Sequence, residues 1–397
     1  MHRIALFIAL ICVSLGFADE EVALLGKKCP NPTLCPQECQ KKDSSCCPPK
    51  AMPCKPCKQG DDPLPDDQYL PSYNAPASVA LKNRTWNFYV DGSYIYWLAG
   101  EEGLTLAYSR ILSGASVFNI DVTTIDQPFQ YQSGFKAGLG VAGDNGTLDA
   151  KYTWIRQKTS VSSDAPAHNI PGTTDIWDSP WFVDTFLFGS DLDSEWTLQM
   201  DLVDLTVGRP YYQGPFITVA PFVGLRGAFI RQYLHLHETS VLVPGHVTET
   251  TVQHSNNLSH SWGIGPRSGL TASCLCMGGF RVFGNIAASL LFTQYTKLAI
   301  DDDLVSSDFR AFSRKEEAAI TNLNVLRPAL ETGLGIGWGF YTPSQNFHFD
   351  IEASYDFSFY WNQNMMRYLV DSIHEQVAPS ANNLYLQGLT VTAGFTF

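Results

Sequence analysis

The sequence predicts an all-β fold, a transmembrane antiparallel β-barrel of about 12 strands that follows an irregular N-terminal segment rich in cysteine and proline. Three observations predict it. The 397 residues are 13% aromatic and only 16% charged, against about 25% charged residues in soluble proteins. Apolar and polar side chains alternate over long stretches, and the connections between these stretches are short and long by turns. Disorder and helical membrane spans are excluded, because aromatic residues are abundant and no run of about 18 apolar residues follows the N-terminus.

Residues 1–18 are predicted to be a cleaved signal peptide. His2 and Arg3 form a short basic start, residues 4–17 are mainly apolar, and Gly16-Phe17-Ala18 provides a cleavage site of the small-x-small type. The chain is therefore expected to be exported, and its barrel to lie in the lipid of a bacterial outer membrane. Its formal net charge of −13 argues against a nucleic-acid partner.

Residues 19–60 form a segment rich in cysteine and proline, which we place in the periplasm. Its cysteines are Cys29, Cys35, Cys39, Cys46, Cys47, Cys54 and Cys57. In an exported chain, disulfides are the commoner use of such residues, and the single C-x-x-C motif does not predict a metal site. Because seven is an odd number, one thiol is left for Cys274, Cys276 or another molecule. Disulfide-linked envelope proteins are therefore possible partners.

The barrel is predicted over residues 84–397, after a polar linker at 61–83 that could also contain a weak first strand near 75–82. The clearest strand is 347–362, in which Phe349 lies on an apolar face and Asp350 on the opposite, mainly polar face. A helix cannot produce such a period of two. The predicted strands are 86–98, 104–111, 129–142, 147–157, 194–207, 216–230, 261–275, 280–294, 323–340, 347–362 and 384–397. Most have at least ten residues, about the length that a tilted strand needs to cross a bilayer.

The lengths of the connections give independent support for a barrel. Short connections are predicted at 99–103, 143–146, 208–215, 276–279 and 341–346, and long ones at 112–128, 158–193, 231–260, 295–322 and 363–383. Outer-membrane barrels place short turns in the periplasm and long loops outside. Eleven strands would start on the external side, which does not suit a periplasmic N-terminal segment. An additional strand near 75–82 would bring the number to twelve.

The final strand carries Phe395 and Phe397 on its apolar face, which resembles the signal that barrel-assembly machinery recognises. Further motifs resemble the pore-forming outer-membrane family of legionellae and chlamydia-like bacteria, relatives in style of the chlamydial major outer-membrane protein. They include Tyr94-Ile95-Tyr96-Trp97, Ala220-Pro221-Phe222-Val223-Gly224, Gly263-Ile264-Gly265-Pro266-Arg267 and Leu326-Arg327-Pro328. The resemblance covers residues 86–397 and implies a porin for passive diffusion of small hydrophilic solutes or ions. The cysteine-rich segment departs from the family pattern, so its role is not implied by it.

If the apolar face of each strand contacts lipid, a set of charged residues faces the lumen. They are Arg226, Arg267, Arg281 and Arg327, with Glu331, Asp350, Glu352 and Asp356. Cations across from carboxylates would set up a transverse field that orients solutes and determines ion preference. The alternative is that these charges pair with one another and stiffen the barrel wall. Both interpretations place them inside, since an arginine facing lipid costs roughly 2–4 kcal/mol near the midplane.

Other functions find less support in the sequence. Motifs of the G-x-S-x-G, H-E-x-x-H and G-x-x-x-x-G-K types do not occur, so we predict no catalytic residue and no cofactor. Histidines cluster at His235, His237, His246, His254 and His260, where exposed loop histidines are commoner than a metal site. The charged stretch 301–317 is expected to be a solvated external loop, or else a constriction inside the pore. A structural or adhesive surface protein, with an incidental or plugged pore, is the alternative function.

Overall fold

The computed structural model describes residue 81 and residues 86–113, 122–143, 146–164, 173–182, 189–213, 217–242, 249–276, 279–306, 313–373, 379 and 381–397. The predicted signal peptide, the cysteine-rich segment and, except for Leu81, the possible strand at 75–82 lie outside these residues. Among the described residues, no helix is long and apolar enough to cross a membrane.

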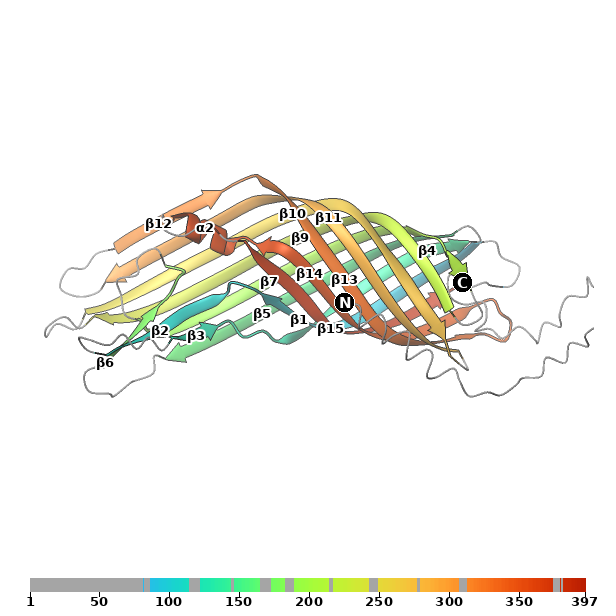
Figure 1. The fold of residues 1–397 in the computed structure, drawn as a ribbon, viewed down its shortest axis with the longest axis horizontal. Coiled ribbons are helices and arrows are strands. Elements are labelled where there is room, and N and C mark those ends of the chain that lie inside the picture. The colour runs from blue at the N-terminus through green and yellow to red at the C-terminus, as the bar shows by residue number, and fades with distance from the viewer. Residues whose placement is uncertain are drawn as a thin grey trace, which may run out of the picture. The chain divides into compact units, whose positions relative to one another are not determined.

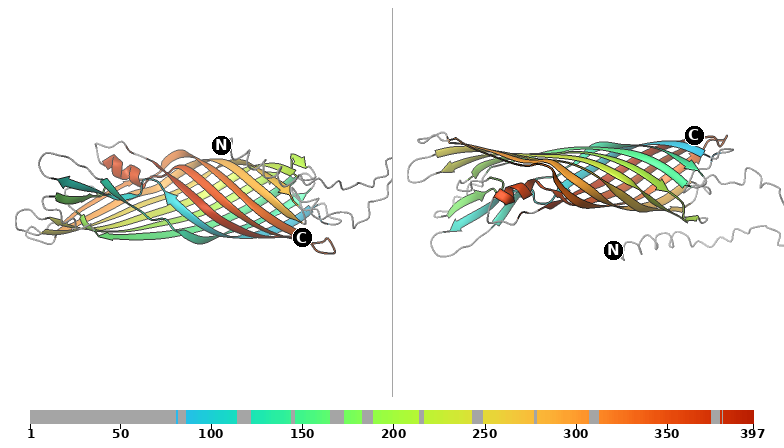
Figure 2. Two further views of the ribbon diagram at one scale, coloured as in Figure 1. Left: turned by 60° about the horizontal axis from the view of Figure 1, so that its bottom comes forward. Right: turned by 90° about the horizontal axis from the view of Figure 1, so that it is seen from above.

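Ten antiparallel strands pair in a closed ring (Figures 1 and 2). Their order in the ring is β1, β4, β5, β7, β9, β10, β11, β13, β14 and β15, and β15 pairs with β1 to close it. Their bounds are β1 (Trp86–Glu101), β4 (Tyr131–Gly143), β5 (Gly146–Asp164), β7 (Gly189–Gly208), β9 (Ile217–Leu242), β10 (Glu249–Leu275), β11 (Phe280–Ser306), β13 (Leu323–Tyr341), β14 (His348–Asn364) and β15 (Asn382–Thr396). Outside the ring, β8 (Tyr212–Gln213) pairs with β9 and β12 (Ser313–Ile320) with β11. The predicted all-β antiparallel barrel is confirmed.

The predicted number of about 12 barrel strands is wrong. The stretch predicted as a strand at 104–111 forms β2 (Thr105–Ser113), which pairs with β3 (Val122–Asp126) and β6 (Thr173–Asp178) in a separate sheet. Alternation reveals that a segment is extended but not which strand it pairs with. The connection at 99–103 is therefore not a turn between two barrel strands.

Because the number of strands is even, the first strand begins and the last strand ends at the same end of the barrel. The strands β4 and β5, β7 and β9, β10 and β11, and β13 and β14 are joined by the short connections, at the end where Trp86 and Phe397 lie. The backbone N–H of Phe88 donates to the Phe397 carbonyl at 3.0 Å, so the first and last strands meet there. By the rule for outer-membrane barrels this end is periplasmic, and no additional strand is needed.

The strands run far beyond the height of a membrane, and their pattern inverts on the way. On β9 the outward face is apolar from Ile217 to Phe229 and turns polar at Arg231. The apolar stretch rises roughly 28 Å at a tilt of about 45°, close to the height of an outer-membrane apolar belt. On the inward face, Arg226 is followed by apolar side chains such as Leu234, which has 0% exposure, whereas outward Leu225 has 52%. We call the part beyond the apolar belt the external extension.

Aromatic side chains mark both edges of the apolar belt, as in outer-membrane barrels generally. The external edge carries outward-facing Tyr131, Trp154, Phe229, Trp262 and Trp361, and the periplasmic edge Trp86, Phe88, Phe280, Trp338, Phe340, Phe349, Phe395 and Phe397. At the periplasmic edge the rings contact one another across strands, with centroids 5.3 Å apart for Phe340 and Phe349. Phe349 faces outward and Asp350 faces an internal cavity, as the alternation predicts.

The external extension contains an apolar core between its strands. Trp196, Leu198 and Met200 of β7 have no exposed surface, and they cluster with residues of the β2 segment and of α2 (Met366–Ile373). Figure 1 shows α2, β2 and β6 at the end of the barrel opposite the C-terminus. Alternation at 194–207 was predicted correctly, but the assignment of its apolar face to lipid is wrong. That face points inward, because this part of β7 lies beyond the membrane, where water surrounds the wall.

Two segments predicted as loops are strands. Most of 231–260 belongs to β9 and β10, which pair from Leu242 and Glu249 onward. The charged stretch 301–317 falls largely in β11 and β12, with Asp301 opposite Glu317. Lys315 and Glu317 are more than half exposed there. This hairpin lies in the wall of the external extension, so the structure does not bring it opposite the arginines as a constriction.

Candidate functional site

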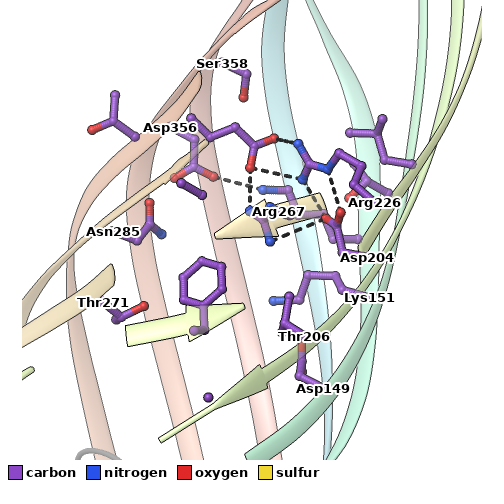
Figure 3. A pocket seen from close by; sticks show the side chains of 18 of the residues that line it. Asp149, Lys151, Asp204, Thr206, Arg226, Arg267, Thr271, Asn285, Asp356 and Ser358 are labelled. Atoms are coloured by element: carbon purple, nitrogen blue, oxygen red, sulfur yellow. Dashed lines mark hydrogen bonds and ion pairs between the residues drawn. The ribbon is translucent and has the colours of Figure 1, made fainter. Parts of the chain in front are cut away.

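The periplasmic half of the barrel interior, which we call the inner half, is polar and holds two adjoining cavities, of about 300 and about 400 Å³. Both are lined by Asp149 and Lys151 of β5 and by Asn285 of β11 (Figure 3). Inward glycines on β13 leave space for long side chains from other strands. A Cβ on Gly337, for example, would lie 3.1 Å from the guanidinium of Arg281. The cavities therefore depend on the period of two that places small and charged residues on the same face.

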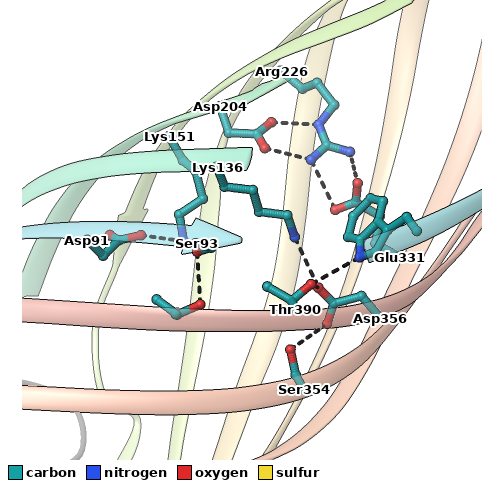
Figure 4. Close-up of polar contacts among 12 residues, drawn as sticks. Asp91, Ser93, Lys136, Lys151, Asp204, Arg226, Glu331, Ser354, Asp356 and Thr390 are labelled. Atoms are coloured by element: carbon teal, nitrogen blue, oxygen red, sulfur yellow. Dashed lines mark hydrogen bonds and ion pairs between the residues drawn. The ribbon is translucent and has the colours of Figure 1, made fainter. Parts of the chain in front are cut away.

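A cluster of four charged side chains crosses the interior at the external limit of these cavities. Nε and Nη2 of Arg226 each donate to the Asp204 carboxylate at 2.6 Å, and Nη2 also donates to Glu331 at 3.0 Å. Arg267 donates to Glu331 at 2.5 Å. Figure 3 labels Arg226, Arg267 and Asp204, and Figure 4 labels Arg226, Asp204 and Glu331. Because the four residues come from β7, β9, β10 and β13, the cluster links distant parts of the ring. Its two cations and two anions balance, and Arg226 is only 2% exposed. We call it the central cluster.

Three further groups of charges lie on the interior wall. Arg281 donates to Asp350 and, at 2.5 Å, to Glu352. Lys136 of β4 donates to Asp356 of β14 at 3.0 Å, and the same carboxylate accepts a hydrogen bond from Thr390 (Figure 4). Lys151 lies 3.6 Å from Asp91. Most charges of the inner half are thus paired across strands.

All eight charged residues predicted to face the lumen face the barrel interior, but they do not form a single row. Arg226, Arg267 and Glu331 meet in the central cluster, and Arg281, Asp350 and Glu352 meet nearer the periplasm. Asp356 pairs with Lys136. Arg327 lies apart, where Nη2 is 3.0 Å from the Met365 sulfur and Nε is 3.4 Å from the Tyr295 hydroxyl, at the base of the apolar core.

Several interior charges were missed in the sequence. Asp204, Lys136, Lys151, Asp91 and Asp149 line the cavities or pair across them. Extending the polar face of the predicted strand 147–157 would have found Asp149 and Lys151. Asp204 could not be found in this way, because it shares the face of Trp196, Leu198 and Met200, which was assigned to lipid. What no parity could show is that Asp204 and Glu331 hold the same arginine. Of the predicted disulfide candidates, Cys274 and Cys276 lie at the periplasmic end of β10, and the others lie outside the described residues.

The external side of the central cluster is closed by the apolar core, and one acid is buried in that core. Glu101, at the external end of β1, is 4% exposed; it accepts hydrogen bonds from Trp196 Nε1 at 3.0 Å and from Gln232 Nε2 at 2.5 Å. Burial raises the pKa of Glu101 from its ordinary value of 4.5 to about 8, although the two hydrogen bonds oppose the shift. The protonated carboxyl is thus the form that the fold favours near neutral pH.

We expect Glu101 to make stability fall as the pH rises. Its pKa is higher in the folded state, so its stabilising contribution is complete below about pH 4.5 and is lost progressively up to about pH 8. Glu101→Gln should remove most of this slope and raise the melting temperature at pH 8, as followed by the heat-dependent mobility of the barrel on gels. Glu102→Gln is the matched control, since Glu102 is exposed and bonds Asn383. Equal slopes in the wild type and in Glu101→Gln would contradict the shift.

Comparison with known proteins gives one strong match. The family model described as Legionella pneumophila major outer membrane protein precursor matches residues 79–397. No curated protein matches the chain. Among solved structures, the outer membrane protease OmpT from Escherichia coli is similar at 12% identity and a TM-score of 0.33, covering 81% of this chain and 98% of that one. The Pseudomonas putida toluene transporter TodX is similar at 8% identity and a TM-score of 0.29, covering 79% and 89%. At these scores the structures say nothing about function.

Proposed function

The chain belongs to the family of the Legionella major outer membrane protein, an outer-membrane protein, and from this and its interior we propose that it is a porin. In this proposal small hydrophilic solutes or ions diffuse passively through the lumen. The observation that carries it is the polar inner half, where cavities of about 300 and about 400 Å³ adjoin and are lined by charges of both signs. A wall that only had to stay folded could be filled with apolar side chains.

Hydration of the inner half supports the proposal. Among the described residues, Arg267 Nε, His348 Nδ1 and Asp350 Oδ1 are buried and have no hydrogen-bond partner in the protein. Buried polar atoms are rarely left without any partner, so water is expected to reach these three. The charges of both signs on the interior wall would then contribute the field expected of a narrow aqueous pore.

Ten strands limit the size of what can pass. A barrel of about 8 strands is just wide enough to be filled by its own side chains, and wide aqueous channels need about 16. The central cluster crosses the lumen, and the apolar core lies beyond it. Passage in our proposal therefore requires that the central cluster and part of the apolar core move aside, which favours ions and very small solutes.

The second candidate function is a structural or adhesive surface protein whose pore is plugged. A specific observation favours it: Trp196, Leu198 and Met200 of the apolar core have no exposed surface, so no open channel passes these three side chains. Liposome swelling with sugars of graded size and planar-bilayer recording of the full chain separate the two functions. Conductance steps in the bilayer support the porin. If the protein causes no liposome swelling and no conductance, the plugged barrel is supported.

If ions pass the cavities, Lys151→Glu should change their selectivity. Lys151 lines both cavities, and replacing it changes the local charge by two units. At about ten ångström through water this lowers the energy of a passing cation and raises that of an anion by about 0.8 kcal/mol each, so the cation-to-anion permeability ratio should rise by roughly 16-fold. The measurement is the reversal potential in a KCl gradient. Lys158→Glu is the control, because Lys158 lies on the same strand but on the external surface, 63% exposed. If Lys151→Glu left the permeability ratio unchanged, ions would not pass through these cavities.

A further inference from the structure

Two histidines lie side by side on the outer surface of the external extension. His237 of β9 and His254 of β10 are direct cross-strand partners. Their Nδ1 atoms are 3.1 Å apart and their ring centroids 4.4 Å apart. Both side chains are accessible to solvent. His237 and His254 are 17 residues apart in the sequence, and the register between β9 and β10 brings them together.

Carboxylates flank this pair on both sides at the same level of the barrel. Asp193 of β7 is the cross-strand partner of His237, and Asp303 of β11 is the partner of His254. Directly opposed residues on one face have Cβ atoms about 4.5–5.5 Å apart. The row Asp193, His237, His254, Asp303 therefore presents two imidazoles between two anions, and Asp301 lies one step away on β11.

The distance within the pair fits a metal ion. A transition-metal ion such as Zn²⁺ binds imidazole nitrogen at about 2.0–2.1 Å, so two nitrogens in tetrahedral coordination are about 3.3 Å apart. Neutral histidine is the commonest protein ligand for such ions, and carboxylate oxygen can complete the coordination. Calcium and magnesium, which take oxygen ligands, would not select this pair.

We propose that His237 and His254 form a binding site for a divalent transition-metal ion, with Zn²⁺ as the reference ion, on the external face of the barrel. Among the described residues, no group of three or more His, Cys, Asp or Glu side chains already surrounds one point. The histidine pair thus supplies the two preformed ligands. Asp193 or Asp303 supplies a further oxygen by changing its rotamer, and water fills the remaining position.

Binding requires no net loss of protons from neutral histidines. In the pair as it stands, one Nδ1 carries the proton and donates it to the other. When the metal binds, that proton moves to Nε2 of the same ring, so both rings are protonated at Nε2 and both Nδ1 lone pairs face the ion. The negative charges of the flanking carboxylates lower the energy of the bound dication.

The neighbouring histidines provide matched controls, because their ring nitrogens have other partners. His235 Nδ1 lies 2.6 Å from Asn256 Oδ1, and His260 Nε2 lies 2.8 Å from the Tyr233 hydroxyl. His235 shares the strand and the face of His237, so His235→Ala removes the same kind of side chain from the same surface. Its loss should leave the proposed site intact.

The test is calorimetric titration of Zn²⁺ into the folded full chain in micelles, with its cysteines alkylated so that thiols cannot bind. We expect one site in the wild type, weakened by more than about tenfold in His237→Ala and in His254→Ala, because even outer-shell partners of a metal contribute about 10–100-fold. His235→Ala should bind like the wild type. Heat-dependent gel mobility shows that each variant is folded, which these surface positions permit.

Two outcomes overturn the proposal. One is a wild type that takes up no Zn²⁺ beyond what the double variant His237→Ala/His254→Ala takes up. The other is equal weakening by all three single variants, which would mean diffuse binding to surface histidines and not to this pair. As a second readout, Zn²⁺ should raise the melting temperature of the wild type but not that of the double variant.

Discussion

Arg226→Ala should destabilise the barrel more than any other substitution of an interior charge. The substitution leaves the carboxylates of Asp204 and Glu331 in the interior without their shared partner, and Arg267 is 3.8 Å from Asp204. Removing one partner of a buried ion pair typically costs about 3–5 kcal/mol, because the remaining charge is desolvated without compensation. Urea unfolding of the protein in lipid vesicles, followed by tryptophan fluorescence, measures the change.

Two variants distinguish this mechanism from a simple loss of packing. In the double variant Arg226→Met/Asp204→Asn the remaining Arg267 and Glu331 still pair and balance in charge, so most of the lost stability should return. Arg231→Ala is the surface control, since Arg231 follows on the same strand but points outward and is exposed. A change below about 0.5 kcal/mol is expected there. If Arg226→Ala were as harmless as Arg231→Ala, water would hydrate the carboxylates of Asp204 and Glu331 fully, and the lumen would be open at this level.

The closed antiparallel sheet was predictable because each membrane-crossing strand carries its environment in its own sequence. At 347–362 the alternation of Phe349 and Asp350 specifies lipid on one side and polar interior on the other. Which strands pair with one another cannot be predicted in this way. The sequence of β2 alternates poorly, since Leu106, Ala107 and Tyr108 follow one another, and its pairing with β3 and β6 removes it from the ring.

The face of a strand was predictable only where the solvent around the barrel was known. The assignment of apolar residues to lipid holds for Leu225 and fails for Met200, because the strands continue past the membrane edge and the surrounding medium changes from hydrocarbon to water. The sequence marks this edge by a change from apolar to charged residues on the outward face. Going from the periplasm to the outside, Val203 is followed by Asp201 on β7, and Trp154 is followed by Arg156 on β5.

The candidate site was predictable in its composition but not in its connections. Inward parity identifies Arg226, Arg267 and Glu331 as interior residues, and the structure places them together. Their meeting depends on which strands face each other across a ring of ten, a property of the whole sheet. The histidine pair illustrates the same limit on the outer surface. His237 and His254 both lie within 231–260, which was predicted to be a single long loop, whereas they belong to two paired strands.

The inversion of the strands predicts that two leucines of β9 respond differently to the same change. Leu234 lies in the buried apolar core of the external extension, whereas Leu225 faces lipid. Leu234→Ala should cost about 3–5 kcal/mol. The transfer free energy of the removed atoms is lost, and the rigid neighbours do not fill the cavity that remains.

Leu225→Ala should cost only about 2 kcal/mol, because lipid chains move into the vacated space and only the transfer energy of the missing methyl and methylene groups is lost. Unfolding free energies in the same vesicles decide between the possible environments of Leu234. A cost equal to that of Leu225→Ala would mean that Leu234 contacts lipid, and the membrane would then reach into the external extension. A cost near zero would mean that water fills the external half of the lumen, which would turn the plugged interior into an open pore and favour diffusion without any movement of the core.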